Sequence, residues 1–379
     1  MTQRTVKAFA AMASHESEAC PSVALRVADS LSLKPMSVVI DGIIFALQRH
    51  GGISVYFHQL LARLRRDQIS ASLTLDGSPL QVSPDAGGSV RVAQRNARLA
   101  ERYRRCRLSN CDVSVFHSSY YRLPDGLGTP SVVTVHDFTY ERFIHGPRRW
   151  IHSAQKSRAI RAAQAVICVS EATRDDLLEY VGVGRAQQVY VVHNGVAGGF
   201  RPEDHPAPDR PFVLFVGQRS GYKNFRLVAE AMTWLPDLEL LCVGGGRLNP
   251  QELRGLPRNT QSRIRHLGFV DDQNLNCLYN QAVCLVYPSS YEGFGIPVIE
   301  AMKAGCPVVC IQCKAVIEVG KAALSVAEPD PIALARKIED IASSEARAAI
   351  VQAGLEVAKS YDWERTYQET LQVYKSVAR

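Results

Sequence analysis

Short, mostly apolar runs recur along the sequence, and helical patterns separate them. A strand without a polar face has both faces covered, as in a parallel sheet with helices on each side. We therefore expect a parallel, doubly wound α/β sheet in the first half. The runs occupy residues 37–41, 69–75, 113–116, 132–135, 165–169 and 189–192, with helical patterns at 52–66, 150–163 and 171–180.

The same alternation stops and then restarts. Residues 195–211 are rich in Gly, Pro and charge, which is typical of an interdomain linker. A chain of 379 residues is long enough for two domains. The predicted fold is α/β, with two Rossmann-like doubly wound domains facing a central cleft, where such sheets bind ligands. In the second half the apolar runs are 212–216, 238–243, 264–267, 283–287 and 307–311, and the helical patterns are 224–235, 297–304 and 331–342.

The expected domain boundaries follow from these patterns. Residues 1–35 lack sustained apolar periodicity and are predicted to be an N-terminal extension. Residues 36–200 form the first domain and 201–359 the second, with 360–379 assigned to the first.

Charge and hydropathy indicate the compartment. No stretch reaches the roughly 18 apolar residues of a spanning helix, and the ten cysteines are too scattered for a disulfide scaffold. We expect a cytoplasmic protein, at most peripheral at the inner face of the cell membrane. The net charge of +7 suits a phosphorylated ligand or an acidic membrane surface, and nucleic acid is not an expected partner.

Residues 292–300 (EGFGIPVIE) join an expected strand to an expected helix. Gly293 and Gly295 allow the backbone to approach a ligand closely, and the N–H groups at a helix start are donors for a diphosphate. The carboxylates of Glu292 and Glu300 are placed to bind hydroxyl groups of a sugar and a ribose. The alternative is a plain turn followed by a solvated Glu300.

Two basic side chains and a histidine follow other expected strands. Arg219 and Lys223 come after the run 212–216 and suit the phosphates of a nucleotide, although exposed ion pairs would also explain them. His136 ends the run 132–135 and is placed to face a sugar, with a turn histidine as the alternative. Gly52, before a helix, is either a neighbour of a phosphate or a simple turn residue.

These motifs together resemble a known family. The stretch from Glu292 to Val309, E-G-F-G-I-P-V-I-E-A-M-x-x-G-x-P-V-V, resembles the E-x7-E signature of retaining GT-B glycosyltransferases of family 4. The likeness runs from about Met36 to the C-terminus, and the nearest branch is the mannosyltransferases of bacterial surface polysaccharide synthesis. Further matches are 215–224 (donor-diphosphate motif), 51–54 (N-domain glycine loop), 133–137 (acceptor-side segment) and 361–365, which begins the final helix that crosses back to the first domain.

The resemblance implies a function. It indicates a retaining enzyme that moves a hexose, most simply mannose, from a nucleotide diphosphate sugar to a lipid-linked or growing glycan. It implies no cofactor and no metal, and no D-x-D motif is present. A nucleotide-sugar epimerase of the same fold and a non-catalytic scaffold of a polysaccharide assembly complex are the alternatives. The implied catalytic residues are Glu292 and His136, and the implied donor-binding residues are Gly52, Arg219, Lys223, Phe294, Gly295, Ile296 and Glu300.

Arginines also recur at helical spacing between residues 91 and 105. Arg91, Arg95, Arg98, Arg102 and Arg105 are three or four positions apart, which predicts a basic amphipathic helix. Such a helix suits an anionic membrane surface, where a lipid-linked acceptor would be found. A solvated charged face is the alternative.

Overall fold

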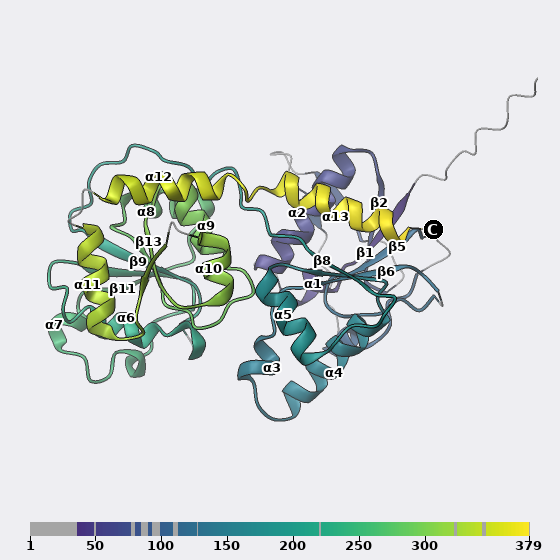
Figure 1. Cartoon of the computed structure of the whole chain (residues 1–379), viewed down its shortest axis with the longest axis horizontal. Coiled ribbons are helices and arrows are strands. Elements are labelled where there is room, and N and C mark those ends of the chain that lie inside the picture. The colour runs from purple at the N-terminus through teal and green to yellow at the C-terminus, as the bar shows by residue number, and fades with distance from the viewer. Residues whose placement is uncertain are drawn as a thin grey trace, which may run out of the picture. The chain divides into compact units, whose positions relative to one another are not determined.

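Two six-stranded parallel sheets form the framework of the protein (Figure 1). The first sheet has the order β2-β1-β5-β6-β7-β8 and the second β11-β10-β9-β12-β13-β14. Their strands are β1 (Ser37–Asp41), β2 (Ser70–Thr74), β5 (Val115–Ser118), β6 (Ser131–Val135), β7 (Ala165–Cys168), β8 (Gln188–Val191), β9 (Phe212–Val216), β10 (Glu239–Val243), β11 (Ile264–Gly268), β12 (Leu285–Tyr287), β13 (Val308–Ile311) and β14 (Leu324–Ala327). The predicted two-domain α/β fold is confirmed.

This computed structural model describes residues 36–48, 51–76, 80–84, 90–92, 99–108, 113–126, 128–219, 221–321, 324–342 and 346–378. The predicted extension 1–35 lies outside the described residues. Residues 36–379 form one unit of contacts that includes both sheets.

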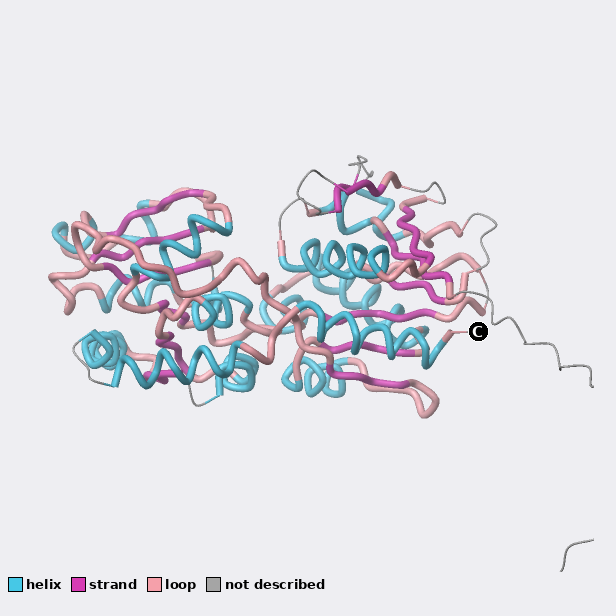
Figure 2. The backbone as a smooth tube through the Cα atoms, turned by 90° about the horizontal axis from the view of Figure 1, so that it is seen from above, coloured by secondary structure: helices cyan, strands magenta, loops and turns pink. Residues whose placement is uncertain are grey.

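Helices lie on both faces of each sheet (Figure 2). Those of the first half are α1 (Ile43–Leu47), α2 (Gly52–Arg66), α3 (Thr139–Phe143), α4 (Pro147–Ala162), α5 (Glu171–Tyr180) and α13 (Trp363–Val377). Those of the second half are α6 (Phe225–Ala231), α7 (Arg258–Gln261), α8 (Asp272–Gln281), α9 (Ile296–Lys303), α10 (Lys314–Gly320), α11 (Pro331–Ala342) and α12 (Ala346–Ala358). In the part of the chain described, no helix combines the length and the apolar character needed to cross a membrane.

The central strands are buried on both faces, as their apolar runs predict. In β9, Phe212 and Leu214 belong to one hydrophobic cluster, whereas Val213 and Phe215 belong to another. Because successive side chains of a strand point to opposite faces, each cluster is the core on one side of the sheet. The expected helices at 171–180 and 331–342 coincide with α5 and α11.

The predicted basic helix at 91–105 is wrong where the structure describes it. Arg91 lies in β4 (Val90–Val92), which pairs with β3 (Val82–Pro84) in a two-stranded antiparallel sheet. Residues 99–103 form a short 3-10 helix, and Arg95 and Arg98 lie outside the described residues. Two β-branched valines flank Arg91, and their strand pairing replaces the helix that the arginine spacing indicated.

Helix α13 packs against α2 and the first sheet, and its aromatic side chains enter that core. Tyr374 is buried, and its hydroxyl lies 2.6 Å from Nδ1 of His117, whose Nε2 lies 2.9 Å from the Thr134 hydroxyl. Burial lowers the pKa of His117 to about 3, so its ring is neutral at pH 7.

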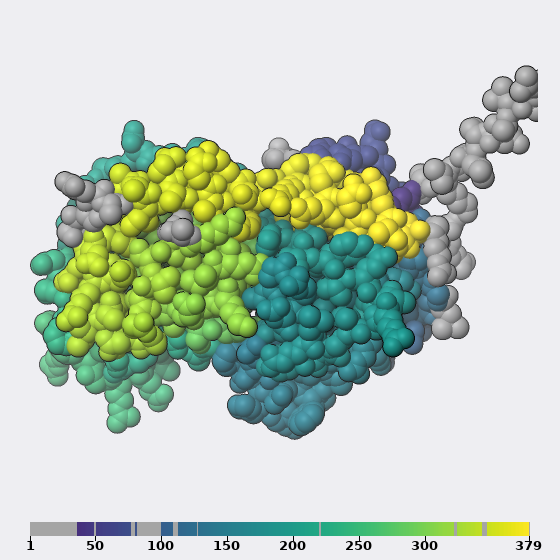
Figure 3. Space-filling view, viewed as in Figure 1, coloured from purple at the N-terminus to yellow at the C-terminus, as the bar shows by residue number. Residues whose placement is uncertain are grey.

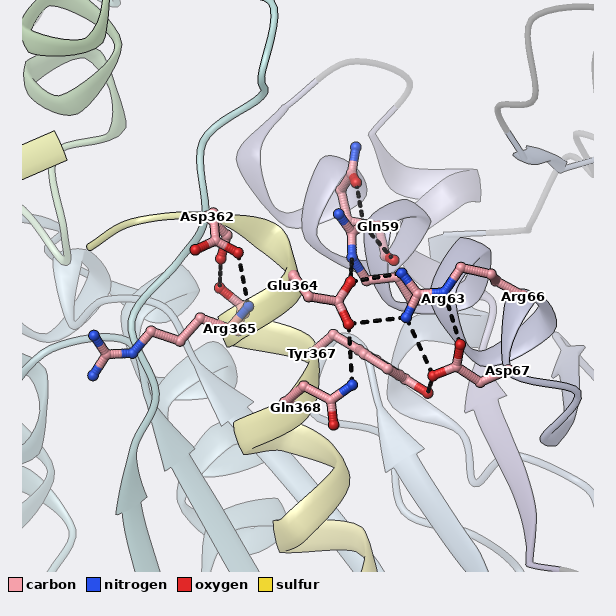
Figure 4. A network of polar contacts seen from close by, with 10 residues as sticks. Gln59, Arg63, Arg66, Asp67, Asp362, Glu364, Arg365, Tyr367 and Gln368 are labelled. Carbon is pink, nitrogen blue, oxygen red and sulfur yellow. Dashed lines mark hydrogen bonds and ion pairs between the residues drawn. The ribbon is translucent and has the colours of Figure 1, made fainter. Parts of the chain in front are cut away.

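A surface network reinforces the position of α13 (Figure 4). The Glu364 carboxylate accepts hydrogen bonds from Arg63 at 3.2 Å and from Arg66 at 2.7 Å and 2.9 Å. The Tyr367 hydroxyl donates to Asp67 at 2.8 Å. Exposed ion pairs contribute little stability, so the buried aromatic contacts carry most of the attachment.

We predict that Tyr374→Phe lowers the free energy of unfolding by about 1 to 3 kcal/mol, because a buried imidazole nitrogen loses its partner. Thermal and denaturant unfolding measure the change. The matched control is Tyr190→Phe, since the Tyr190 hydroxyl is bonded at the exposed surface. A loss no larger than that of the control would contradict the role assigned to the Tyr374 hydroxyl.

Candidate active site

The strand order of each sheet changes direction at one point. In the first sheet β1 and β5 are neighbours, and in the second β9 and β12 are neighbours. Ligands of open α/β sheets bind outside the carboxyl ends of the strands at such switch points. Predicted site residues lie in the chain after these strands, among them Gly52 after β1, Lys223 after β9 and Glu292 after β12.

Lys223 and Glu292 form an ion pair. Lys223 ends the 3-10 helix Gly221–Lys223, and Glu292 lies in the loop between β12 and α9. The Lys223 and Glu292 side chains are 14% and 12% exposed, so solvent or a ligand reaches both. The ammonium also lies 5.4 Å from the Tyr287 ring centroid and 5.5 Å from that of Tyr222. The structure thus brings together a cation and a carboxylate that are 69 positions apart.

The loop that carries Glu292 lies directly against the first half. A Cβ atom on Gly293 would overlap the carbonyl oxygen of His136, so only glycine permits this approach. The Gly293 carbonyl accepts hydrogen bonds from the hydroxyls of Ser170 at 2.6 Å and Thr173 at 3.0 Å. Ser170 is also the N-cap of α5, because its side chain accepts from the Thr173 amide.

Tyr291, one residue before Glu292, makes a second contact between the halves. Its hydroxyl accepts from the Phe138 amide at 2.6 Å and donates to Asp176 at 2.8 Å. Arg142 pairs with the same aspartate, and its guanidinium lies 5.1 Å from the Tyr291 ring centroid. The turn that follows His136 is therefore tied to the loop on which Glu292 lies.

Glu318 lies near the end of α10, the helix that follows β13, and caps a helix of the other half. Its carboxylate accepts from the amides of Glu171 at 2.8 Å and Ala172 at 3.0 Å, at the start of α5. Nε2 of His193 lies 2.9 Å from the same carboxylate. Burial alone would raise the pKa of Glu318, but the hydrogen bonds from His193 and the two amides lower it overall.

His136 lies at the end of β6, in the predicted place. Burial lowers its pKa to about 4, although the Asp137 carboxylate acts in the opposite direction. The ring is therefore neutral at pH 7. Nε2 has no hydrogen-bond partner among the described residues, and the Tyr56 ring packs edge-on at 5.3 Å. A neutral imidazole with a free nitrogen is able to form one hydrogen bond to a ligand.

Two helix N-termini meet near this loop. A Cβ atom on Gly52, the first residue of α2, would lie 3.4 Å from Cδ1 of Ile296, the first residue of α9. Gly295 precedes α9 in the left-handed conformation, with φ of 105°, which glycine adopts without strain. Helix N-termini present unpaired amides and a positive dipole end, which together suit a diphosphate.

Glu300 lies one turn inside α9, and the Tyr279 hydroxyl of α8 donates to it at 3.1 Å. Burial raises the pKa of Glu300 to about 7, and the Tyr279 hydrogen bond acts against this rise. A carboxylate that is half ionised near neutral pH is unusual and is often found at ligand sites.

Two predicted donor residues make structural contacts within the second half. The Arg219 side chain is 2% exposed and donates to Glu252 at 3.0 Å and to the carbonyls of Gly244 at 2.9 Å and Gly246 at 2.7 Å. These contacts support the glycine turn after β10, and the assignment of Arg219 to the donor diphosphate stays a prediction. The Phe294 side chain is 4% exposed and packs in the core, which leaves only its backbone for a ligand.

Among the described residues, no group of three or more His, Cys, Asp or Glu side chains has the arrangement of a metal site. The expectation that donor binding needs no metal stays a prediction.

Family models match both halves of the chain. The model described as Glycosyltransferase Family 4 matches residues 50–197, and Glycosyl transferases group 1 matches residues 200–357. The chain belongs to the family 4 glycosyltransferases of the GT-B fold. Both matches include the residues described above, from Gly52 and His136 in one half to Lys223 and Glu292 in the other.

Curated relatives of this glycosyltransferase are more distant. The O-antigen chain mannosyltransferase B of Escherichia coli is 28% identical over 287 residues, or 69% of this chain and 74% of the relative. The alpha-maltose-1-phosphate synthase of Mycolicibacterium smegmatis is 27% identical over 290 residues, or 66% of this chain and 74% of the relative.

Solved structures of similar fold include a sucrose-phosphate synthase from Thermosynechococcus elongatus. It has a TM-score of 0.71 and 19% identity, and the match covers 90% of this chain and 98% of that chain. Anabaena HepE in complex with UDP and glucose has a TM-score of 0.62 and 15% identity, with coverage of 90% and 100%. At these identities the likeness shows the fold.

The sequence-based prediction of the site missed four residues whose contacts join the two halves: Tyr291, Ser170, Thr173 and Glu318. One local signal was present: Ser170-Glu171 directly follows the apolar run 165–169, as an N-cap at the carboxyl end of a strand does. The partner of that cap, Glu318, is 147 positions from Glu171, and no local pattern links the two.

We predict that Gly293→Ala reduces turnover of this glycosyltransferase about 100-fold or more, because the new methyl group displaces the Glu292 loop from His136. The unfolding transition should remain cooperative, since each sheet keeps its core. Initial rates of sugar transfer measure the effect. The matched control is Gly198→Ala, where an added Cβ meets nothing within 4 Å. Turnover within about threefold of the wild type would contradict the close approach.

Proposed function

We propose that this protein is a retaining hexosyltransferase that moves mannose from a nucleotide diphosphate sugar to a lipid-linked or growing glycan. The observation that carries the proposal is the Lys223–Glu292 pair, located at a switch point and joined through Gly293 to the His136 turn. The relationship to the Escherichia coli O-antigen mannosyltransferase supports mannose as the sugar. A lipid-linked acceptor would place the enzyme in the cytoplasm, at the inner face of the cell membrane.

In the proposed reaction the diphosphate is the leaving group. As the bond between the anomeric carbon and the phosphate oxygen breaks, negative charge accumulates on that oxygen. The Lys223 ammonium and the amides at the starts of α2 and α9 stabilise this charge. The proposal requires no metal, because these groups supply the positive potential.

The acceptor hydroxyl then attacks the same face of the sugar. Its oxygen bonds to the anomeric carbon, and its proton passes to the departing phosphate oxygen, so no side-chain base is required. Glu292 accepts hydrogen bonds from sugar hydroxyls, and neutral His136 donates or accepts one through Nε2. Glu300 accepts a hydrogen bond from the ribose of the donor.

A transfer assay with a panel of GDP-, UDP-, ADP- and dTDP-sugars, run in EDTA, tests this function. We expect acceptor-dependent transfer of mannose, with an α-linked product from an α-linked donor by NMR of the anomeric proton. Lys223→Ala should lower turnover about 100-fold or more, and more than His136→Ala. Lys359→Ala is the control, since Lys359 forms a comparable ion pair at the exposed surface, 2.6 Å from Glu356. A β-linked product, strict dependence on Mg²⁺, or a product formed without acceptor would contradict the proposal.

The raised pKa of Glu300 predicts that nucleotide binding depends on pH. Its pKa is raised to about 7, so the carboxylate that accepts the ribose hydrogen bond becomes populated between pH 6 and 8. Nucleotide-sugar affinity should rise over this interval in the wild type, relative to Glu300→Gln, which has no ionisable group. Glu300→Ala should weaken binding by about 1.5 to 3 kcal/mol. Calorimetry at each pH measures both effects, and equal pH profiles for wild type and Glu300→Gln would refute the assignment.

The same raised pKa affects stability in the opposite direction. Between the unfolded value of 4.5 and about 7, the native state binds more protons than the unfolded state. The contribution of Glu300 to the free energy of unfolding therefore falls as pH rises through this range. As pH rises, the affinity for the nucleotide sugar is therefore expected to increase, while the contribution of Glu300 to the free energy of unfolding decreases.

A further inference from the structure

The solvent-facing side of α4 combines arginines with large apolar side chains. Trp150 is 71% exposed and Ile151 is 53% exposed. Arg148, Arg158 and Arg161 are exposed on the same helix. Helical spacing places Trp150, Ile151, Arg158 and Arg161 on one side. Arg148 is exposed in the first turn of the helix, and we call these five residues the α4 face.

Acidic side chains are absent from this segment. Residues 145–170 contain no Asp or Glu. The nearest carboxylate before them in sequence, Glu141, is buried and paired with Lys156 at 3.2 Å. After them, Glu171 pairs with Arg174 at 2.5 Å. The α4 face therefore has a positive potential without a matching acidic patch on its own helix.

Aromatic side chains adjoin the arginines. The Arg149 guanidinium lies 5.8 Å from the Trp150 ring centroid. The 3-10 helix Leu99–Tyr103 contacts α4, because Gln155 of α4 donates to the Arg102 carbonyl. Tyr103, at the end of that short helix, is 43% exposed. The other exposed tryptophan, Trp234, lies in the second half and is 54% exposed.

We propose that the α4 face docks on the surface of an anionic lipid bilayer. Tryptophan is favoured at the headgroup level of membranes, where its ring is amphipathic, and arginines attract anionic headgroups. Neither an isolated exposed apolar residue nor a basic patch alone would suffice, and the α4 face has both. The surface lies on a different segment from the arginine series at 91–105.

The position of α4 connects this surface to the candidate active site. Helix α3 begins three residues after His136 and leads into α4. Phe143, at the end of α3, stacks on Tyr222 of the second half with ring centroids 4.8 Å apart. The α3 and α4 segments project at the lower edge of the first half (Figures 1 and 3). The inference rests on the proposed function in one respect, since it assumes that the acceptor arrives from the membrane.

Sedimentation with vesicles tests the docking. Wild-type protein should bind vesicles of phosphatidylcholine with about one third phosphatidylglycerol at least tenfold more tightly than pure phosphatidylcholine, and high salt should weaken this binding. Arg148→Glu with Arg158→Glu should lower the binding about tenfold or more. Trp150→Ala should lower it about fivefold, with loss of the quenching of tryptophan fluorescence by brominated lipids.

Matched controls lie in the second half. Arg254→Glu with Arg258→Glu makes the same change of net charge at exposed positions, and Trp234→Ala removes the other exposed indole. Both controls should bind within about twofold of the wild type. Equal binding to neutral and anionic vesicles, or equal losses in the controls, would overturn the proposal.

Turnover with a soluble, lipid-free acceptor separates this inference from the proposed function. The α4 variants should keep wild-type turnover on that acceptor. If wild-type protein binds anionic vesicles through α4 but transfers no sugar, the proposed function fails and the docking stands. If transfer is normal but the α4 variants bind vesicles as the wild type does, the docking fails alone.

Discussion

The absence of a side chain at Gly293 is the constraint on which the arrangement of the site depends. The backbone of the Glu292 loop touches the carbonyl of His136, and no other residue type fits at that distance. This approach turns the Gly293 carbonyl toward α5, where the hydroxyls of Ser170 and Thr173 both donate to it. One backbone position therefore sets the distance between the residues of the two sheets.

The contacts around Gly293 are strong because they use the ends of helices. The amides at the start of α5 have no partner within the helix, and the Glu318 carboxylate of the other half accepts from two of them. A carboxylate at a helix N-terminus gains from the dipole as well as from the hydrogen bonds. The pKa of Glu318 is lowered because these hydrogen bonds stabilise its charged form. Charge-assisted hydrogen bonds thus join the two halves at the start of α5.

Most of the fold followed from the sequence, and the reason is physical. A buried strand must be apolar on both faces, so the runs that became β6, β7, β9 and β13 were visible without any knowledge of their partners. Short or partly polar elements were missed, among them β14 (Leu324–Ala327) and α10 (Lys314–Gly320). The glycines of the Glu292 loop were informative, because Gly293 allows a close approach and Gly295 adopts a left-handed conformation. Spacing alone was not informative for Arg91, since strand pairing overrode it.

Arg219 shows what sequence cannot distinguish. An arginine that binds phosphate and an arginine that binds backbone carbonyls look the same in a sequence, because only their partners in the folded structure differ. Arg219 donates to a turn of three glycines, and Arg263 likewise donates to the carbonyls of Leu235 and Leu238 at 2.6 Å. Lys223 differs from both, because its described hydrogen bond is to one carboxylate and its other contacts are aromatic faces. An ammonium with a single anionic partner is able to exchange that partner for a phosphate at little cost, whereas an arginine that supports a backbone turn is not.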